Sequence, residues 1–255
     1  KPLWLKPPAH VLGTRALEAL KPCSTSSMLR KDTVIVLAQA AERVSRYDEM
    51  SEFMQERVEM GIALTPEERD LFSAACKNAL QGRRHAWRVA AAVEMQEGAD
   101  GRSENANLAL GYKGKIEAEL TEICTKVTKL IENILTAAGS DEDAEATVFF
   151  LKMQADYYRY MAESTQGRQQ EEAIGNAHSA YTAGIEKADA LLSDDPVRLG
   201  LVLNFSVFLH EVIGRTHEAV ETARVGLDAA IGSQNQDSLL TMSLLQQNLE
   251  LWGAA

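Results

Sequence analysis

The sequence predicts an all-α protein, and two observations support this. Prolines occur only at positions 2, 7, 8, 22, 66 and 196, so none interrupts a helix between residues 67 and 195. Apolar residues recur at steps of three and four, whereas alternating runs of β-branched residues, which would predict strands, are missing. The period predicts about nine helices from residue 30 onward, and short loops would make neighbouring helices antiparallel.

The chain begins with a segment unlike the rest. Residues 1–28 are predicted to be an N-terminal extension, in which residues 11–20 form a short extra amphipathic helix that ends at Pro22. The small polar run 23–27 is typical of a linker. Residues 29–255 would then form one helical domain, long enough to bury a sizeable core.

Helix starts and stops divide this domain. Breaks are predicted near residues 61, 97–102, 138–143, 166–168, 193–196, 214–216 and 232–237. Thr65-Pro66 offers an N-cap threonine, a proline at the first helical position and a following glutamate for a capping box, and Asp195-Pro196 repeats the cap-then-proline pattern. One long helix carries an apolar stripe from Ile116 to Ile134, and the next helix should start near Ser140.

Composition excludes several classes of function. Lys and Arg number 26 against 37 Asp and Glu, a net charge of −11, which argues against nucleic acid as the main partner. Three widely spaced cysteines without a CxxC pair favour reduced thiols and a cytoplasmic location. No stretch approaches 18 apolar residues, so we expect no membrane partner.

Two stripes of cations indicate an anion site. Lys77, Arg84 and Arg88 stand at i, i+7 and i+11, which returns them to within roughly 20° of one direction on a helix. On another helix Lys152 and Arg159 share a face flanked by Tyr160, and Asp156 lies one turn from each end. A solvated face of salt bridges is the alternative for each stripe. A shared phosphate site is the functional interpretation, because guanidinium groups bind phosphate bidentately.

Two further helices each carry an asparagine within an apolar stripe. Leu203, Asn204, Val207 and Glu211 lie on one of them, and Leu240, Leu244, Asn248 and Leu251 lie on the other. Periodicity alone favours an ordinary core face with one satisfied polar residue. The functional alternative is a groove wall, in which leucines pack ligand side chains and amides bind the ligand backbone.

Sequence signals for catalysis are weak. His210-Glu211 begins like the zinc motif HExxH, but Gly214 stands where the second histidine is required. Neither a G-x-S-x-G nucleophile motif nor a phosphate-binding P-loop occurs. We therefore expect no enzyme activity, no cofactor and no metal.

Five stretches, in order along the chain, resemble the 14-3-3 family. They are residues 69–79 (RDLFSAACKNA), 83–88 (RRHAWR), 150–160 (FLKMQADYYRY), 198–208 (RLGLVLNFSVF) and 237–252 (DSLLTMSLLQQNLELW). The resemblance covers roughly residues 30–252. It differs where Gln246-Gln247 replaces a usual Arg-Asp pair and where Thr241 replaces an aliphatic residue.

The resemblance implies a cup-shaped homodimer, with nine antiparallel helices and an amphipathic groove in each subunit, that binds phosphoserine or phosphothreonine segments of client proteins and regulates signalling. It assigns the phosphate to Lys77, Arg84, Arg159 and Tyr160, with Arg88, Lys152 and Asp156 in support. It assigns the ligand backbone to Asn204 and Asn248, the apolar wall to Leu203, Val207, Leu240, Leu244 and Leu251, and the groove edges to Glu211 and Trp252. It places Arg46, Glu49, Tyr112, Lys115 and Glu119 at the dimer interface, with Arg46–Glu119 and Glu49–Lys115 as cross-subunit ion pairs. A helical scaffold for unphosphorylated peptides is the alternative function.

Overall fold

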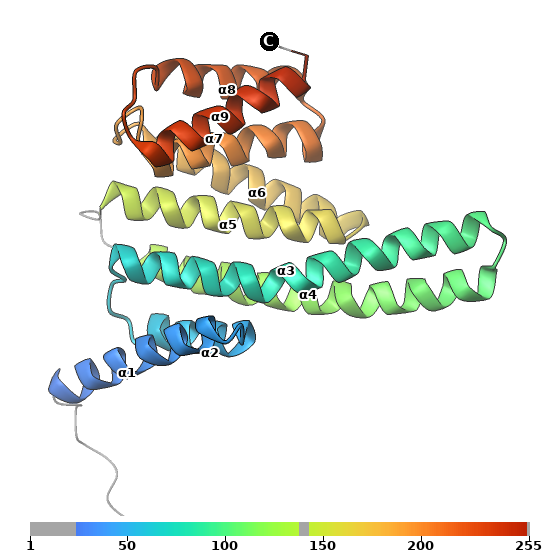
Figure 1. Ribbon diagram of the computed structural model, residues 1–255, viewed down its shortest axis with the longest axis horizontal. Helices are drawn as coiled ribbons and strands as arrows, with labels where there is room; N and C mark the ends of the chain where they lie inside the picture. The colour runs from blue at the N-terminus through green and yellow to red at the C-terminus, as the bar shows by residue number, and fades with distance from the viewer. Residues whose placement is uncertain (1–23, 138–142, 254–255) are drawn as a thin grey trace, which may run out of the picture.

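A computed structural model describes residues 24–137 and 143–253 of the chain, with side chains from residue 30 onward. Over these residues the protein is all-α, as predicted, and consists of nine α-helices with one π-helical turn (Figure 1). The elements are α1 Ser24–Arg43, α2 Tyr47–Glu59, α3 Pro66–Ala99, α4 Ser103–Ala137, α5 Ala144–Ser164, α6 Gly167–Ala188, α7 Pro196–Phe208, η1 Leu209–Ile213, α8 Thr216–Ala229 and α9 Gln236–Leu251.

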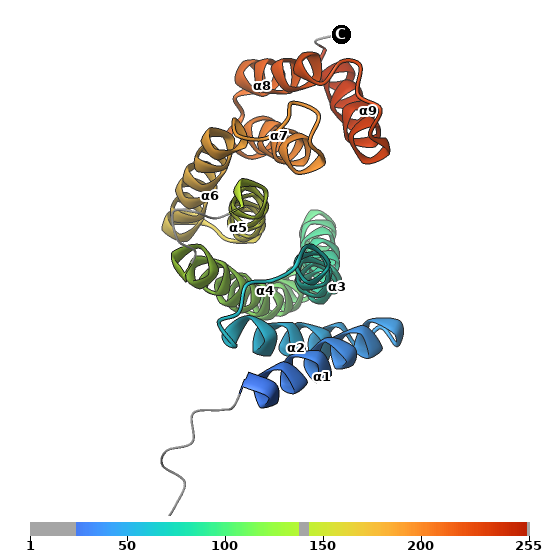
Figure 2. The same cartoon turned by 90° about the vertical axis from the view of Figure 1, so that its left-hand side faces the viewer.

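The helices stack into a curved layer, and Figure 2 shows the curve end-on. Helices α3, α5, α7 and α9 lie along its inner side, while α4, α6 and α8 lie outside them. Helices α1 and α2 cover one end, and the long α3–α4 pair projects well beyond the other helices (Figure 1). This arrangement agrees with the expected cup and places the stripes of α3 and α5 on the same side of the layer.

Caps fix where the helices begin. The Thr65 hydroxyl accepts from the Glu68 amide at 3.3 Å, and the Glu68 carboxylate accepts from the Thr65 amide at 3.0 Å, which is the predicted capping box. Asp195 caps α7 by accepting from the Val197 amide at 2.8 Å. Both prolines therefore occupy first-turn positions, as the sequence indicated.

Burial follows the predicted periodicity. Ile116, Leu120, Val127 and Ile131 of the α4 stripe are buried in a core shared with α1, α2, α3 and α5. A separate apolar core forms among α7, α8 and α9, around Leu199 and Leu245. The apolar stripe of α4 thus packs against α3 and α5 and fixes the two helices that carry the cation stripes.

A buried ion pair fastens the first three helices together. The Arg57 guanidinium of α2 is fully buried and donates to Glu68 of α3 at 2.6 Å and to the carbonyls of Ile62 and Ala63 at 2.8 and 2.9 Å. Lys31 of α1 adds an ion pair to the same carboxylate at 3.0 Å. This network ties α1 and α2 to the helix that carries the first cation stripe.

Three sequence expectations need correction. Helix α5 begins at Ala144 rather than near Ser140, because the Asp143 side chain accepts from the Glu145 amide and caps the helix there. Helix α1 begins at Ser24, so residues 24–27 are helical instead of a linker; serine and threonine suit a first turn as well as a loop. The expected helix at residues 11–20 lies outside the described residues.

The third correction concerns apolar length. Residues 196–213 form an 18-residue helical run with a mean hydropathy of 1.4, long and apolar enough to cross a membrane by length and composition alone. Leu199, Leu201 and Phe208 in this run are fully buried among neighbouring helices. Burial in the core therefore accounts for the apolar character of these residues, which belong to the 39% of the run that is buried.

Candidate phosphate-binding site

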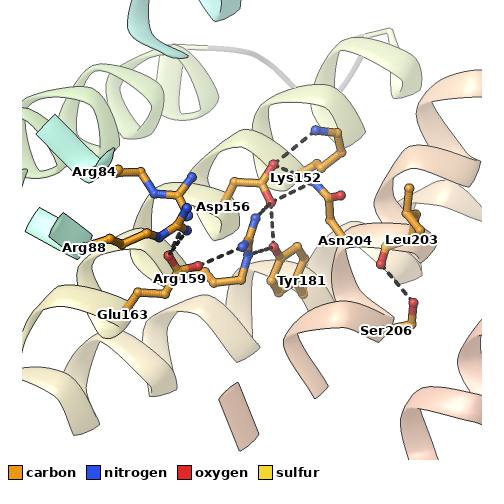
Figure 3. Close-up of polar contacts among 10 residues, drawn as sticks. All are labelled: Arg84, Arg88, Lys152, Asp156, Arg159, Glu163, Tyr181, Leu203, Asn204 and Ser206. Carbon is orange, nitrogen blue, oxygen red and sulfur yellow. Dashed lines mark hydrogen bonds and ion pairs between the residues drawn. The ribbon is translucent and has the colours of Figure 1, made fainter. Parts of the chain in front are cut away.

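Members of both cation stripes lie close together: Figure 3 shows Arg84 and Arg88 of α3 beside Arg159 of α5. Arg84 comes from α3, and its guanidinium stacks over the Tyr160 ring of α5 with its carbon 3.9 Å from the ring centroid. The Arg159 guanidinium approaches the same ring at 4.7 Å. Arginines from two helices thus converge on one tyrosine, an arrangement that periodicity alone left open.

The outer part of the site is more accessible. Lys77 is exposed and forms no ion pair or hydrogen bond with the part of the chain that the structure describes. Arg88 is also exposed and reaches Glu163 only at 3.6 Å. Tyr160 is half-buried, and its burial and the nearby Asp156 raise the pKa of the phenol, so the hydroxyl remains a neutral donor.

Asp156 organises the inner part of the site. Its buried carboxylate accepts from the Tyr181 hydroxyl at 2.6 Å, from the Asn204 amide at 2.9 Å and from Lys152 at 3.2 Å (Figure 3). Arg159 lies 3.4 Å from the same carboxylate. Four donors from three helices therefore share one acceptor.

The charge on Asp156 survives its burial. Burial by itself would raise the pKa of this carboxyl, yet the charges of Lys152 and Arg159 and the Tyr181 hydroxyl hold it below its ordinary value. Burial likewise opposes the charge of Arg159, but Tyr181 and Asp156 raise its pKa above the ordinary value. Both groups are charged at neutral pH, so Arg159 is held as a fixed cation.

Sequence reasoning missed Glu163, which occupies the centre of the site. One carboxylate oxygen accepts from Arg159 at 3.0 Å, and the other accepts from Arg84 at 2.5 Å. Its spacing of i+4 from Arg159 is the sequence signal that could have indicated the first contact. The contact with Arg84 bridges 79 residues and could not be read from spacing.

The predicted groove residues lie on α7 and α9, the other two helices of the inner side. Leu203 and Val207 are half-buried, whereas Leu240, Leu244 and Leu251 are exposed, at 66%, 41% and 81%. Glu211 is exposed in the π-helical turn. Because Leu240, Leu244 and Leu251 are exposed, these three residues of α9 do not belong to the apolar core.

The two asparagines differ in their surroundings. The Asn204 side-chain nitrogen donates to both oxygens of Asp156 at 2.9 Å, which leaves its carbonyl oxygen free to accept. The side-chain amide of Asn248 forms no hydrogen bond within residues 24–137 and 143–253. Trp252 stacks on His210 with ring centroids 4.7 Å apart, a pairing that sequence analysis did not single out.

The residues that depart from the family pattern bond within their own helix. The Thr241 hydroxyl donates to the Asp237 carbonyl at 3.2 Å, and Gln246 donates to Glu250 at 3.3 Å. Gln247 donates to Ser243 at 3.3 Å. Among the described residues, these three polar side chains form hydrogen bonds only within α9.

The expected dimer residues lie on α4 and at the start of α2. Arg46 pairs with Glu49 within the chain, and Glu119 accepts from Arg83 at 3.1 Å. Lys115 is exposed without a partner among the described residues, and Tyr112 is 60% exposed. The cross-subunit pairs Arg46–Glu119 and Glu49–Lys115 therefore stay predictions.

Comparison with known proteins places this geometry in a family. The family model for 14-3-3 proteins matches residues 37–253. Over 232 residues the chain is 38% identical to 14-3-3 protein 2 of Entamoeba histolytica, covering 88% of this chain and 97% of that protein. It is 39% identical over 233 residues to the 14-3-3-like protein GF14 chi of Arabidopsis thaliana (87% of this chain, 86% of that protein) and 40% identical over 238 residues to GF14-12 of Zea mays (89% and 90%). The chain belongs to the 14-3-3 family, whose members are generally non-catalytic adaptors that bind client proteins.

Proposed function

We propose that this protein binds phosphoserine- or phosphothreonine-containing segments of client proteins and thereby regulates signalling partners. The observation that carries the proposal is the convergence of Arg84 and Arg159, from two helices, on Tyr160. Two guanidinium groups offer paired donors to one phosphate, and the phenol offers a third kind of donor. Lys77, unpaired and exposed on the same face of α3, adds a mobile cation.

A phosphate in this site would gain from several charge-assisted hydrogen bonds. Each contributes about 1.5–3 kcal/mol net, and partial desolvation places the bonds toward the upper end of that range. Arg159 is only 12% exposed and Arg84 24% exposed, so solvent screens them less than it screens an open surface pair.

The inner face of α7 and α9 supports binding of the flanking chain. The side-chain nitrogen of Asn204 donates its hydrogen bonds to Asp156, so the side-chain oxygen of Asn204 is left to accept from a backbone N–H of an extended ligand. Asn248 offers an unpaired amide on α9. Exposed leucines of α9 provide apolar surface for ligand side chains next to these polar contacts.

A phosphopeptide and its unphosphorylated twin test the proposal. We expect the phosphoserine peptide to bind and the serine peptide not to bind in a fluorescence-polarisation titration at pH 7.5. Equal affinities would instead favour a helical scaffold for unphosphorylated peptides. Since the second pKa of the phosphate is about 6, affinity should also fall below roughly that pH.

A charge reversal separates the two functions at the level of a residue. Arg84→Glu should abolish phosphopeptide binding, because it removes one guanidinium and adds a repelling carboxylate. Arg168→Glu is the matched control, since Arg168 lies on α6 and is 91% exposed in an ion pair with Glu172. Binding that survives Arg84→Glu would support the scaffold alternative.

We further propose that the protein is a homodimer in which α1 and α2 of one subunit pack against the part of α4 around Tyr112 in the other. Large apolar side chains are exposed there, among them Val36 at 62%, Leu108 at 73% and Tyr112 at 60%. Light scattering of the full chain and of a variant without residues 1–28 should give the mass of two subunits in both cases. A monomer in both cases would refute the dimer. We also propose that the protein acts in the cytoplasm without catalytic activity or cofactor.

A further inference from the structure

We propose that the Glu163 carboxylate occupies the phosphate site in the free protein and competes with anionic ligands. Small free anions would then be excluded, and only ligands that make additional contacts would bind. The inference rests on the proposed function and names a residue within that site that sets the affinity for anions. It starts from the position of the Glu163 carboxylate, which joins Arg84 of α3 to Arg159 of α5. A bound phosphate would have to make the same bridge.

The bridge uses the donors that a ligand needs. Arg84 Nη2 donates to one Glu163 oxygen at 2.5 Å, and Arg88 lies 3.6 Å from that oxygen. Arg159 Nη1 donates to the other oxygen at 3.0 Å. An anion can therefore reach either arginine in full only after the Glu163 carboxylate has moved away.

Glu163 can leave more easily than the other carboxylate of the site. Its side chain is 26% exposed, and it stands one residue before the end of α5, so its carboxylate can rotate into water. Asp156 is 9% exposed and accepts from Tyr181, Asn204 and two cations, so it stays in place.

The arginines keep their positions when Glu163 leaves. Arg159 remains tied through Nη2 to Asp156 and through Nε to the Tyr181 hydroxyl at 3.2 Å. Arg84 remains stacked on the Tyr160 ring. Only Arg159 Nη1 and Arg84 Nη2 change their acceptor, from Glu163 to the incoming anion. Glu163 therefore competes for donors whose positions are fixed by other contacts.

Displacing Glu163 carries the same cost for every anion. Inorganic phosphate has only its oxygens to offset that cost. A phosphorylated segment adds backbone contacts at Asn204 and Asn248 and apolar contacts on α9. The chemical class admitted is therefore a phosphate monoester on an extended peptide, and free phosphate is kept out at concentrations that would otherwise fill the site.

The test compares Glu163→Gln with the wild type, using inorganic phosphate as the probe in isothermal titration calorimetry on the full chain. We expect roughly tenfold tighter phosphate binding, the effect of losing two partly exposed carboxylate contacts. A phosphoserine peptide should gain by a similar factor. Glu163→Asp keeps the charge but shortens the reach, and it should fall between the two proteins.

Glu172→Gln is the matched control, because it removes the same charge from an exposed ion pair with Arg168 on α6. It should change phosphate affinity less than twofold. If Glu163→Gln leaves phosphate binding unchanged or weakens it, Glu163 positions the arginines instead and the proposal is overturned. The inorganic phosphate result decides this even if the wild type fails to distinguish a phosphopeptide from its serine twin, which would refute only the proposed function.

Discussion

Asp156 is the single acceptor for four donors at the candidate site, and its replacement by asparagine should destabilise the fold strongly. Tyr181, Asn204 and Lys152 donate to its oxygens at 2.6, 2.9 and 3.2 Å, and Arg159 lies 3.4 Å away. In Asp156→Asn one of these oxygens becomes an NH₂ group, which would face other donors. The two cations also lose their buried counter-charge.

The magnitude follows from these contacts. Removing one partner of a buried ion pair costs about 3–5 kcal/mol, because the remaining charge stays in a poorly hydrated place. A chain of this size loses about 2–4 °C of melting temperature for each kcal/mol. Asp156→Asn should therefore lower the melting temperature by roughly 6–20 °C.

Circular dichroism at pH 7 measures the loss of stability, by thermal unfolding and by urea unfolding. Asp189→Asn is the control, because Asp189 is 78% exposed and its pair with Arg198 is a surface contact of 3.3 Å that is worth at most about 1 kcal/mol. If the free energies of unfolding of the Asp156→Asn and Asp189→Asn proteins differ by less than about 1 kcal/mol, the hydrogen-bond network around Asp156 does not stabilise the fold as expected.

Other regions of the chain give further predictions. Arg57→Met should cost about 3–5 kcal/mol in urea unfolding, because the buried Glu68 carboxylate loses its guanidinium partner and two carbonyls lose their donor. Gly226→Ala should cost about 1–3 kcal/mol, since its new Cβ would lie 2.6 Å from a Val202 methyl, and Val202→Ala in the same chain should restore most of that loss. Burial raises the pKa of Asp156 and of Glu68, but their cationic partners lower it by more, so both pKa values lie below the ordinary value. The stability that these carboxylates contribute should therefore be complete above about pH 5 and disappear as the pH falls through the lowered pKa values. An acid-unfolding curve of the Arg57→Met protein as steep as that of the wild type would contradict the Glu68 part.

Local signals in the sequence were enough to predict the helices. Thr65-Pro66 and Asp195-Pro196 cap α3 and α7 as expected, and the stripe from Ile116 to Ile134 faces the core. These features depend on neighbours within one or two turns, which spacing encodes. The start of α5 was misplaced because Ser140 and Asp143 are both acceptable caps, and local sequence does not decide between them.

The candidate site was only partly predictable, because several of its contacts join residues that are far apart in the sequence. The cations Arg84 and Arg159 were identified from spacing, but Glu163 and Tyr181 were not, because the contacts of Glu163 with Arg84 and of Tyr181 with Asp156 join different helices. Tyr181 of α6 reaches Asp156 across 25 residues, and Arg84 reaches Glu163 across 79. Such pairs are fixed by how the helices pack, and a single sequence without that packing shows only ordinary charged and aromatic residues.

The acidic composition and the basic site are compatible because charge acts over short distances. The net charge of −11 is spread over the whole chain, and at physiological ionic strength it is screened beyond roughly 8 Å. A ligand near α3 and α5 therefore responds mainly to the nearby charges of Lys77, Arg84 and Arg159 and of the Glu163 carboxylate between the two arginines. Nucleic acid needs rows of cations that follow successive phosphates, whereas Arg84 and Arg159 converge on one tyrosine. The same geometry that favours a single phosphate group thus disfavours a polyphosphate backbone.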